Sequence, residues 1–193
     1  MAQPSNLVKK QTLYISIGAA LIIGFLSGVV YSVYNAPAYQ NQAASDPHEQ
    51  ESSVITSLEL ETQKNPDNVQ AWVKLGHAYF DSEQSEKAIT AYEKALTILP
   101  GDINVMTDLG VMYRRNGQPD KAIATFDAVL KLNPEHEQAR FNKGVVLLND
   151  FNEKNQALAE WRKLLEINPD AKAPSGAPMG ELIKQIAESS NNS

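Results

Sequence analysis

Residues 66–100 read PDNVQAWVKLGHAYFDSEQSEKAITAYEKALTILP, and residues 100–134 read PGDINVMTDLGVMYRRNGQPDKAIATFDAVLKLNP. The second stretch repeats the first position by position. The matched pairs are Trp72 and Met106, Leu75 and Leu109, Gly76 and Gly110, Tyr79 and Tyr113, Ala88 and Ala122, Tyr92 and Phe126, and Ala95 and Val129. The period continues in both directions, because Pro66, Pro100, Pro134 and Pro169 recur at separations of 34, 34 and 35 residues. Self-similarity at such a period is the signature of a repeat fold.

The chemistry of the repeated positions predicts a pair of helices in each period. Proline ends one helix and tolerates the first turn of the next. Gly76 and Ala88 are small where two helices would cross closely, and Trp72, Leu75 and Tyr79 are large enough to fill the space around that crossing. The pattern resembles the tetratricopeptide repeat (TPR), a helix–turn–helix unit of 34 residues with helices A and B. The resemblance implies an all-α right-handed superhelix of about three such units.

The repeat domain is expected over residues 52–172. It comprises a lone half-repeat helix at 52–64 and repeats at 69–102, 103–136 and 137–171. The third repeat is the loosest, since it needs one inserted residue near 149–154 and has Arg140 and Lys143 where large apolar residues are usual. Residues 173–193 are expected to form a Pro/Gly/Ser linker and a C-terminal capping helix, since Leu182, Ile183 and Ile186 have helical spacing.

The N-terminal region has a different composition. The 22 residues from Leu13 to Tyr34 carry no charge, and a helix of that length would cover about 33 Å, enough to cross a bilayer. We therefore expect a short N-terminus at 1–11, a transmembrane helix at 12–34 and a polar stalk at 35–51. Lys9 and Lys10 predict a single-pass inner-membrane protein with its N-terminus in the cytoplasm and its repeats in the periplasm. A cleaved signal peptide ending near residues 36–38 is the alternative.

Composition argues against several classes of function. The net charge of −6 disfavours a nucleic-acid partner, and the absence of cysteine excludes disulfides, iron–sulfur clusters and thiol nucleophiles. His48, His77 and His136 are scattered without the spacing of metal ligands. No nucleotide-binding or hydrolase motif occurs. We expect no enzyme activity, no metal and no cofactor.

The residue pattern also predicts a binding face. Positions 2, 5, 9 and 12 of each helix A lie apart from its packing positions, on the side that forms the concave groove of TPR proteins. With Arg115 added, the candidate groove residues are Val73, His77, Phe80, Thr107, Val111, Arg114, Arg115, Phe141, Val145 and Leu148. Positions 5 and 9 lack the lysine and asparagine with which some relatives clamp a carboxylate. An apolar or amphipathic protein segment is therefore the expected ligand, with the arginine pair available to an acidic group. Phe141 and Leu148 have an alternative role as core covered by the C-terminal helix.

These expectations together indicate a membrane-tethered adaptor that binds a partner protein. The phrase Asn65-Pro66-Asp67 followed by Trp72, Leu75-Gly76 and Tyr79 is also similar to the repeat domain of bacterial c-type cytochrome maturation factors. That resemblance implies presentation of apocytochrome to the haem-attachment machinery. A homo-oligomeric scaffold in the cell envelope is a further alternative, because Gly24 and Gly28 form a small-xxx-small pattern that allows a homodimer in lipid.

Overall fold

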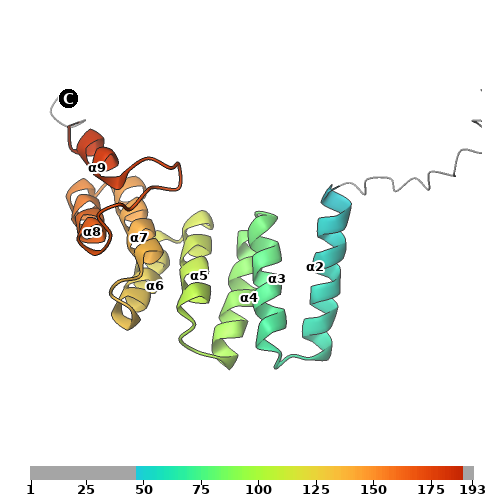
Figure 1. The fold of residues 1–193 in the computed structure, drawn as a ribbon. Coiled ribbons are helices and arrows are strands. Elements are labelled where there is room, and N and C mark those ends of the chain that lie inside the picture. The colour runs from blue at the N-terminus through green and yellow to red at the C-terminus, as the bar shows by residue number, and fades with distance from the viewer. Residues whose placement is uncertain (1–46, 189–193) are drawn as a thin grey trace, which may run out of the picture. The chain divides into compact units, whose positions relative to one another are not determined.

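A computed structural model describes residues 47–188, and these residues form an all-α repeat fold (Figure 1). The helices are α2 (Pro47–Lys64), α3 (Val69–Asp81), α4 (Ser85–Ile98), α5 (Ile103–Arg115), α6 (Pro119–Leu132), α7 (Glu137–Asn149), α8 (Lys154–Ile167) and α9 (Met179–Glu188). No helix in this part of the chain is long and apolar enough to span a membrane. The expected transmembrane helix at 12–34 and the N-terminus at 1–11 lie outside the described residues.

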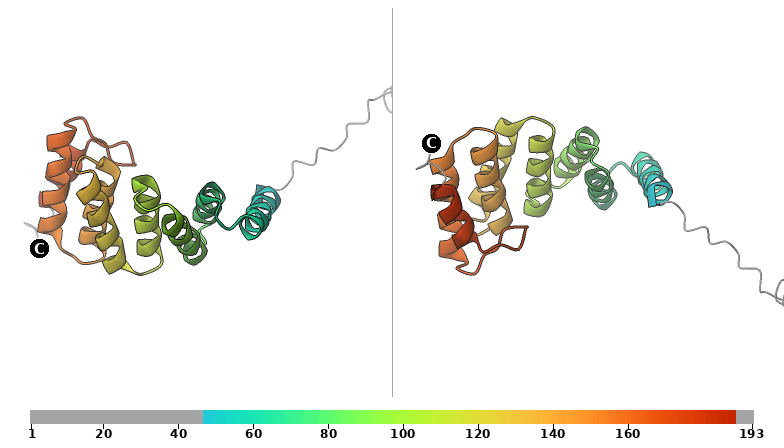
Figure 2. Two further views of the ribbon diagram at one scale, coloured as in Figure 1. Left: turned by 90° about the horizontal axis from the view of Figure 1, so that it is seen from below. Right: turned by 90° about the horizontal axis from the view of Figure 1, so that it is seen from above.

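Three helix pairs form the repeats, namely α3 with α4, α5 with α6 and α7 with α8. Each pair lies side by side in every view, and successive pairs stack in chain order (Figure 1 and Figure 2). Helix α2 packs on α3 at one end, and α9 packs on α8 at the other. The prediction of an all-α, TPR-like fold is confirmed for these residues.

A close helix crossing recurs in each repeat. A methyl group at Gly76 would lie 2.4 Å from the ring of Tyr92, one at Gly110 2.6 Å from Phe126, and one at Gly144 2.3 Å from Trp161. Such contacts are far inside van der Waals distance. Helix A therefore needs glycine at this position so that an aromatic ring of helix B can lie against its backbone.

The ends of the A helices are fixed by side chains and turns. Asn68, Asp102 and His136 each cap a helix A by accepting a hydrogen bond from a backbone N–H in its first turn. The A–B turns contain one residue of positive φ each, at Glu83, Gly117 and Asn152. The third turn is one residue longer than the other two, which is the insertion that the sequence required.

The flanking segments differ from expectation in their bounds. Helix α2 begins at Pro47 rather than at residue 52, so the expected stalk gives up its last residues to this helix. Proline suits the first helical position because its missing N–H would be unpaired there in any case. Between α8 and α9, Lys172 and Pro178 form an isolated antiparallel bridge, and Met179 and Ile183 of α9 are buried in the C-terminal core cluster.

Arg140 and Lys143 are accommodated by ion pairs. Arg140 is 8% exposed and contacts Glu160 with 2.8 Å between Nη1 and Oε2. Lys143 contacts both Asp127 and Glu160 through its Nζ atom. The third repeat therefore packs its helix A through charges, whereas the first two use apolar side chains at these positions.

Candidate peptide-binding groove

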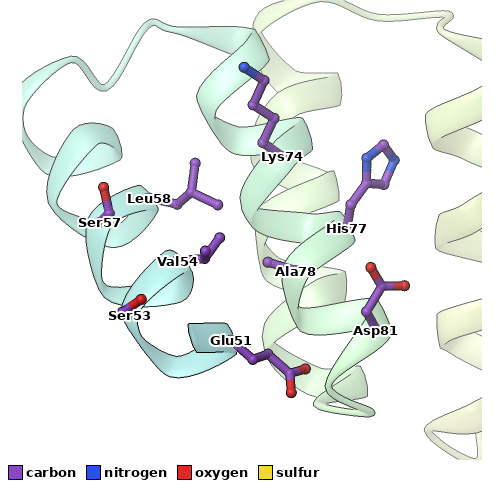
Figure 3. Close-up of a pocket in the computed structure, with 9 residues that line it drawn as sticks. All are labelled: Glu51, Ser53, Val54, Ser57, Leu58, Lys74, His77, Ala78 and Asp81. Carbon is purple, nitrogen blue, oxygen red and sulfur yellow. The ribbon is translucent and has the colours of Figure 1, made fainter. Parts of the chain in front are cut away.

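Helices α2 and α3 enclose an open hollow of about 690 Å³, which we call the α2–α3 groove. Its lining residues are Glu51, Ser53, Val54, Ser57 and Leu58 from α2, and Lys74, His77, Ala78 and Asp81 from α3. Figure 3 shows Val54 and Leu58 projecting from α2 toward Ala78 on α3. Helix α2 thus forms one wall of a candidate site as well as covering the end of the repeat stack.

The groove combines an apolar floor with a polar rim. Val54 is 51% exposed, an unusual position for a large aliphatic side chain, and it lies one helical turn from the half-buried Leu58. Lys74 and Asp81 stand on the rim from the α3 side. An exposed apolar strip with charged borders is typical of a surface that receives a partner's amphipathic segment.

A second, smaller hollow adjoins the first between α3 and α5. This α3–α5 pocket has a volume of about 280 Å³ and is lined by His77, Phe80, Asp81 and Asp108. His77 and Asp81 line both hollows, so the α2–α3 groove and the α3–α5 pocket share a border. Figure 3 shows these two side chains projecting from α3 on the side that faces away from α2.

Electrostatics in the α3–α5 pocket are dominated by acidic groups. Asp108 lies 3.2 Å from His77, measured from Oδ2 to Nε2. Burial raises the pKa of the Asp108 carboxyl; His77 acts in the opposite direction, and Asp102 and Asp81 add to the rise. The His77 ring also lies edge-on to Tyr92 at 5.7 Å between centroids.

The expected arginine pair is already engaged. Arg114 Nε lies 2.5 Å from Asp150 Oδ2, at the C-terminal end of α7. Arg115 lies over the ring of Phe80, 4.6 Å from its centroid. The two side chains thus connect α5 to the preceding and the following helix A. Arg114 is thus ion-paired, whereas Arg115 has only a cation–π contact and no ion pair with a described residue.

The other groove residues expected in the first two repeats are buried or half-buried. Thr107 is 1% exposed and its hydroxyl donates to the Ile103 carbonyl oxygen, so its side chain is not presented at the surface. Val73 and Val111 are half-buried against the core of the first two repeats.

In the third repeat, the three apolar groove candidates belong to a different core. Phe141, Val145 and Leu148 are half-buried against the C-terminal core cluster, to which α9 contributes. Phe141 also stacks on Trp161 at 6.1 Å between ring centroids. The alternative role considered for Phe141 and Leu148, as packing residues, describes their contacts better than an open groove face does.

Sequence reasoning missed Val54, Leu58, Ala78, Asp81 and Asp108. A signal for the α3 members was present, because residues 74, 77, 78 and 81 are spaced as one helical face. We expected the face at positions 2, 5, 9 and 12 instead. The contribution of α2 had no signal in the repeat pattern, since that helix lies outside the three complete repeats.

Comparison with known proteins supports the architecture. Residues 32–173 match the family described as the cytochrome c-type biogenesis protein H TPR domain. None of the curated proteins matches the chain in sequence.

Several solved structures share the fold. A crystal structure of MamA is 21% identical with a TM-score of 0.57, over 65% of this chain and 76% of that one. A tetratricopeptide repeat protein from Parabacteroides merdae is 23% identical with a TM-score of 0.62, over 72% of this chain and 52% of that one. MamA from Desulfovibrio magneticus is 18% identical with a TM-score of 0.59, over 64% of this chain and 70% of that one. Identities this low support the fold alone.

Proposed function

This chain belongs to the family of the cytochrome c-type biogenesis protein H TPR domain, and we propose from that premise that it is a non-catalytic adaptor in c-type cytochrome assembly. The proposed ligand is the C-terminal helix of an apocytochrome, bound in the α2–α3 groove. The observation that carries the proposal is the apolar strip of Val54, Leu58 and Ala78 in that groove. An amphipathic helix presents apolar side chains at spacings of 3 and 4, which suits such a strip.

The proposal includes attachment to the membrane through residues 12–34. It rests on the uncharged sequence there and on Lys9 and Lys10 before it, which favour a cytoplasmic N-terminus and periplasmic repeats. Confinement to the membrane would raise the local concentration of the groove near other membrane-bound assembly factors. Single cysteines at Ser5→Cys and Ser45→Cys can be labelled selectively, because the chain has no cysteine of its own. Labelling of position 5 but not 45 from outside the membrane would reverse the proposed orientation.

Binding can be tested with two matched variants of α2. Val54 and Leu60 are 51% and 50% exposed on the same helix, but only Val54 lines the groove. The full-length chain in detergent micelles is titrated with a fluorescent peptide of an apocytochrome C-terminal helix. We expect Val54→Glu to weaken binding about tenfold or more, since a charge on a central apolar contact is poorly tolerated. Leu60→Glu should bind as the native chain does.

Two results would overturn the proposal. One is absence of binding at high micromolar peptide concentration, and the other is an equal loss in both variants. The alternative homo-oligomeric scaffold is separated by native mass measurement of the full chain. A stable oligomer that forms without peptide and is insensitive to Val54→Glu would favour the scaffold.

A further inference from the structure

The α3–α5 pocket contains an excess of negative charge. Asp81 and Asp108 both line it, and among the residues that the structure describes neither carboxylate has an ion pair with a lysine or arginine. His77, the partner of Asp108, is charged only when it is protonated. Asp81 is also the last residue of α3, where the helix dipole places further negative potential.

A buried hydroxyl beside the pocket lacks a partner. Tyr92 is fully buried, and its hydroxyl has no hydrogen-bond partner among residues 47–188. The equivalent ring in the second repeat is Phe126, which has no polar atom, and in the third repeat the Trp161 indole N–H donates to the Phe141 carbonyl oxygen. Tyr92 alone among these three rings therefore has an unsatisfied polar atom, an uncommon and costly situation.

Tyr92 lies behind His77 and does not itself line the pocket. Its ring lies against Gly76 and edge-on to His77, which lines the pocket. Burial raises the pKa of Tyr92, and Asp108 and Asp81 add to the rise, so both carboxylates are within electrostatic range of the hydroxyl.

We propose that the α3–α5 pocket binds the guanidinium group of an arginine residue, with Asp81 and Asp108 as its charge partners. This inference rests on the proposed function, in which that arginine belongs to the partner helix lying in the adjoining α2–α3 groove. A guanidinium has five N–H donors in a planar fork and can address several acceptors at once. A lysine ammonium has the same charge but lacks this geometry.

A cation beside the pocket, Arg115, does not already fill this role. Arg115 lies over the Phe80 ring and has no ion pair with a described residue. Phe80 therefore already has a guanidinium on its ring while the two carboxylates are left for a ligand. The pocket thus has acceptors for one more cationic group, because His77 at Asp108 is the only ion-pair partner that either carboxylate has within residues 47–188.

The pocket itself can be tested without any partner protein. The full-length chain, labelled for NMR, is titrated with N-acetyl-arginine methylamide, and the resonances of His77 and Tyr92 are followed. We expect saturable shifts at these residues, and none with the citrulline analogue, which has the same shape without the charge. Absence of localised shifts, or equal shifts with citrulline, would overturn the inference.

Variants then assign the acceptors. Asp81→Asn/Asp108→Asn should abolish the arginine shifts, whereas Asp67→Asn/Glu166→Gln, which changes the net charge equally at two exposed sites, should preserve them. Tyr92→Phe should leave both the fold and the arginine shifts intact, because Phe126 fills the same position in the second repeat and Tyr92 does not line the pocket. An unchanged affinity in Asp81→Asn/Asp108→Asn would remove these carboxylates from the site.

A peptide series relates the pocket to the proposed function. In an arginine-containing apocytochrome C-terminal peptide, each arginine is replaced in turn by citrulline and each lysine by glutamine. We expect one citrulline replacement to weaken binding about tenfold in the native chain and to have no effect in Asp81→Asn/Asp108→Asn. Coupling to a lysine only, or losses equal in both proteins, would contradict the inference although the peptide binds. A peptide that fails to bind while arginine methylamide still shifts His77 would overturn the proposed function and leave the pocket standing.

Discussion

The second and third repeats place opposite chemistry at the same two positions of helix A. Met106 and Leu109 in the second repeat are apolar, and one period later Arg140 and Lys143 are cationic. Leu109 is buried in the main core cluster and Met106 packs against it. Arg140 and Lys143 instead converge on Glu160, which stands where the second repeat has Thr125 once the longer A–B turn is counted.

The hydrogen bond to the proline carbonyl oxygen before each helix A also differs between an aromatic and a cationic donor. In the first repeat the Trp72 indole N–H donates to the Pro66 carbonyl oxygen at 2.8 Å. In the third, Arg140 Nη2 donates to the equivalent carbonyl of Pro134 at 2.5 Å. Arginine thus replaces tryptophan as a large flat group with a donor in the same place. The guanidinium adds a charge, and Glu160 compensates it.

The difference shows which part of the repeat is fixed and which is variable. The contact between glycine and an aromatic ring is present in all three repeats at nearly the same distance. The two neighbouring positions of helix A are apolar in the second repeat, as Met106 and Leu109. In the third repeat they are Arg140 and Lys143, which together with Glu160 form what we call the ionic layer. The ionic version requires that each charge keeps its partner, because a buried charge that loses its partner is far costlier than an apolar contact that is lost.

The largest predicted effect comes from removing the shared acid. Glu160→Thr introduces the residue of the second repeat and leaves Arg140 and Lys143 without their common partner. We expect the free energy of unfolding to fall by about 3–5 kcal/mol, the usual cost of breaking a buried ion pair on one side. Urea unfolding of the full-length chain, followed by far-ultraviolet circular dichroism, measures the loss.

A triple variant provides the matched control. Arg140→Met/Lys143→Leu/Glu160→Thr converts the whole layer to the chemistry of the second repeat. It should recover native stability or exceed it, since apolar replacements of buried ion pairs are often neutral or stabilising by about 1–4 kcal/mol. A triple variant less stable than Glu160→Thr would mean that this layer cannot be exchanged between repeats.

The sequence predicted the repeats themselves, but it did not predict how the charged residues of the third repeat are paired. The proline period and the matched small and large residues predicted the repeats, and α3, α5 and α7 begin at Val69, Ile103 and Glu137, where the repeats were expected. Arg140 and Lys143 stood out as unusual, but their partners could not be inferred. Glu160 comes into register only after the insertion in the third turn, and Asp127 belongs to the preceding repeat.

The candidate site was harder to predict than the fold. His77 and Phe80 were expected on the concave face, and both line the α3–α5 pocket. Thr107 satisfied the same spacing rule, yet it is buried. Helical periodicity gives the direction of a side chain, but the exposure of that side chain depends on how closely the next repeat packs.

Acid should distinguish the ionic layer from its apolar replacement. Burial alone would raise the pKa of Glu160, but the hydrogen bond from Lys143 and the nearby charges of Lys143, Lys163 and Arg140 outweigh it and lower the pKa below its ordinary 4.5. A lowered pKa means that the stabilisation is present above that value and is lost as the pH falls through the folded value. We expect the native chain to lose on the order of 1 kcal/mol more than the triple variant on acidification below about pH 4.5. Parallel acid-unfolding curves for the two proteins would contradict this.

Alkali should test a contact found only in the first two repeats. The Tyr79 hydroxyl donates to Glu59 and that of Tyr113 to Glu93, whereas the third repeat has Leu147 in this place. Burial and the acceptor Glu59 raise the pKa of Tyr79 from 10.0 to about 12. The stabilisation is therefore complete below pH 10 and is lost as the pH rises through about 12.

Tyr79→Phe should cost about 1 kcal/mol at neutral pH and remove part of the alkaline loss, measured by unfolding at several pH values. Equal alkaline loss in Tyr79→Phe and the native chain would contradict the role of this hydrogen bond.

The smallest predicted effect concerns the A–B turns, where the three repeats share a backbone conformation but not a residue. The φ angle is 58° at Glu83, 69° at Gly117 and 56° at Asn152. A left-handed conformation costs a residue with a side chain about 1–2 kcal/mol, although asparagine is relieved by local hydrogen bonding, and glycine adopts it freely. Glycine in turn costs about 0.5–1 kcal/mol of backbone entropy, so Glu83→Gly should stabilise the first repeat by a net of about 0.5 kcal/mol. That gain corresponds to a rise in Tm of roughly 1–2 °C in thermal unfolding. Gly117→Glu should have the opposite sign and a similar size; stabilisation by Gly117→Glu, or destabilisation by Glu83→Gly, would show that side-chain contacts of the turn outweigh its backbone conformation.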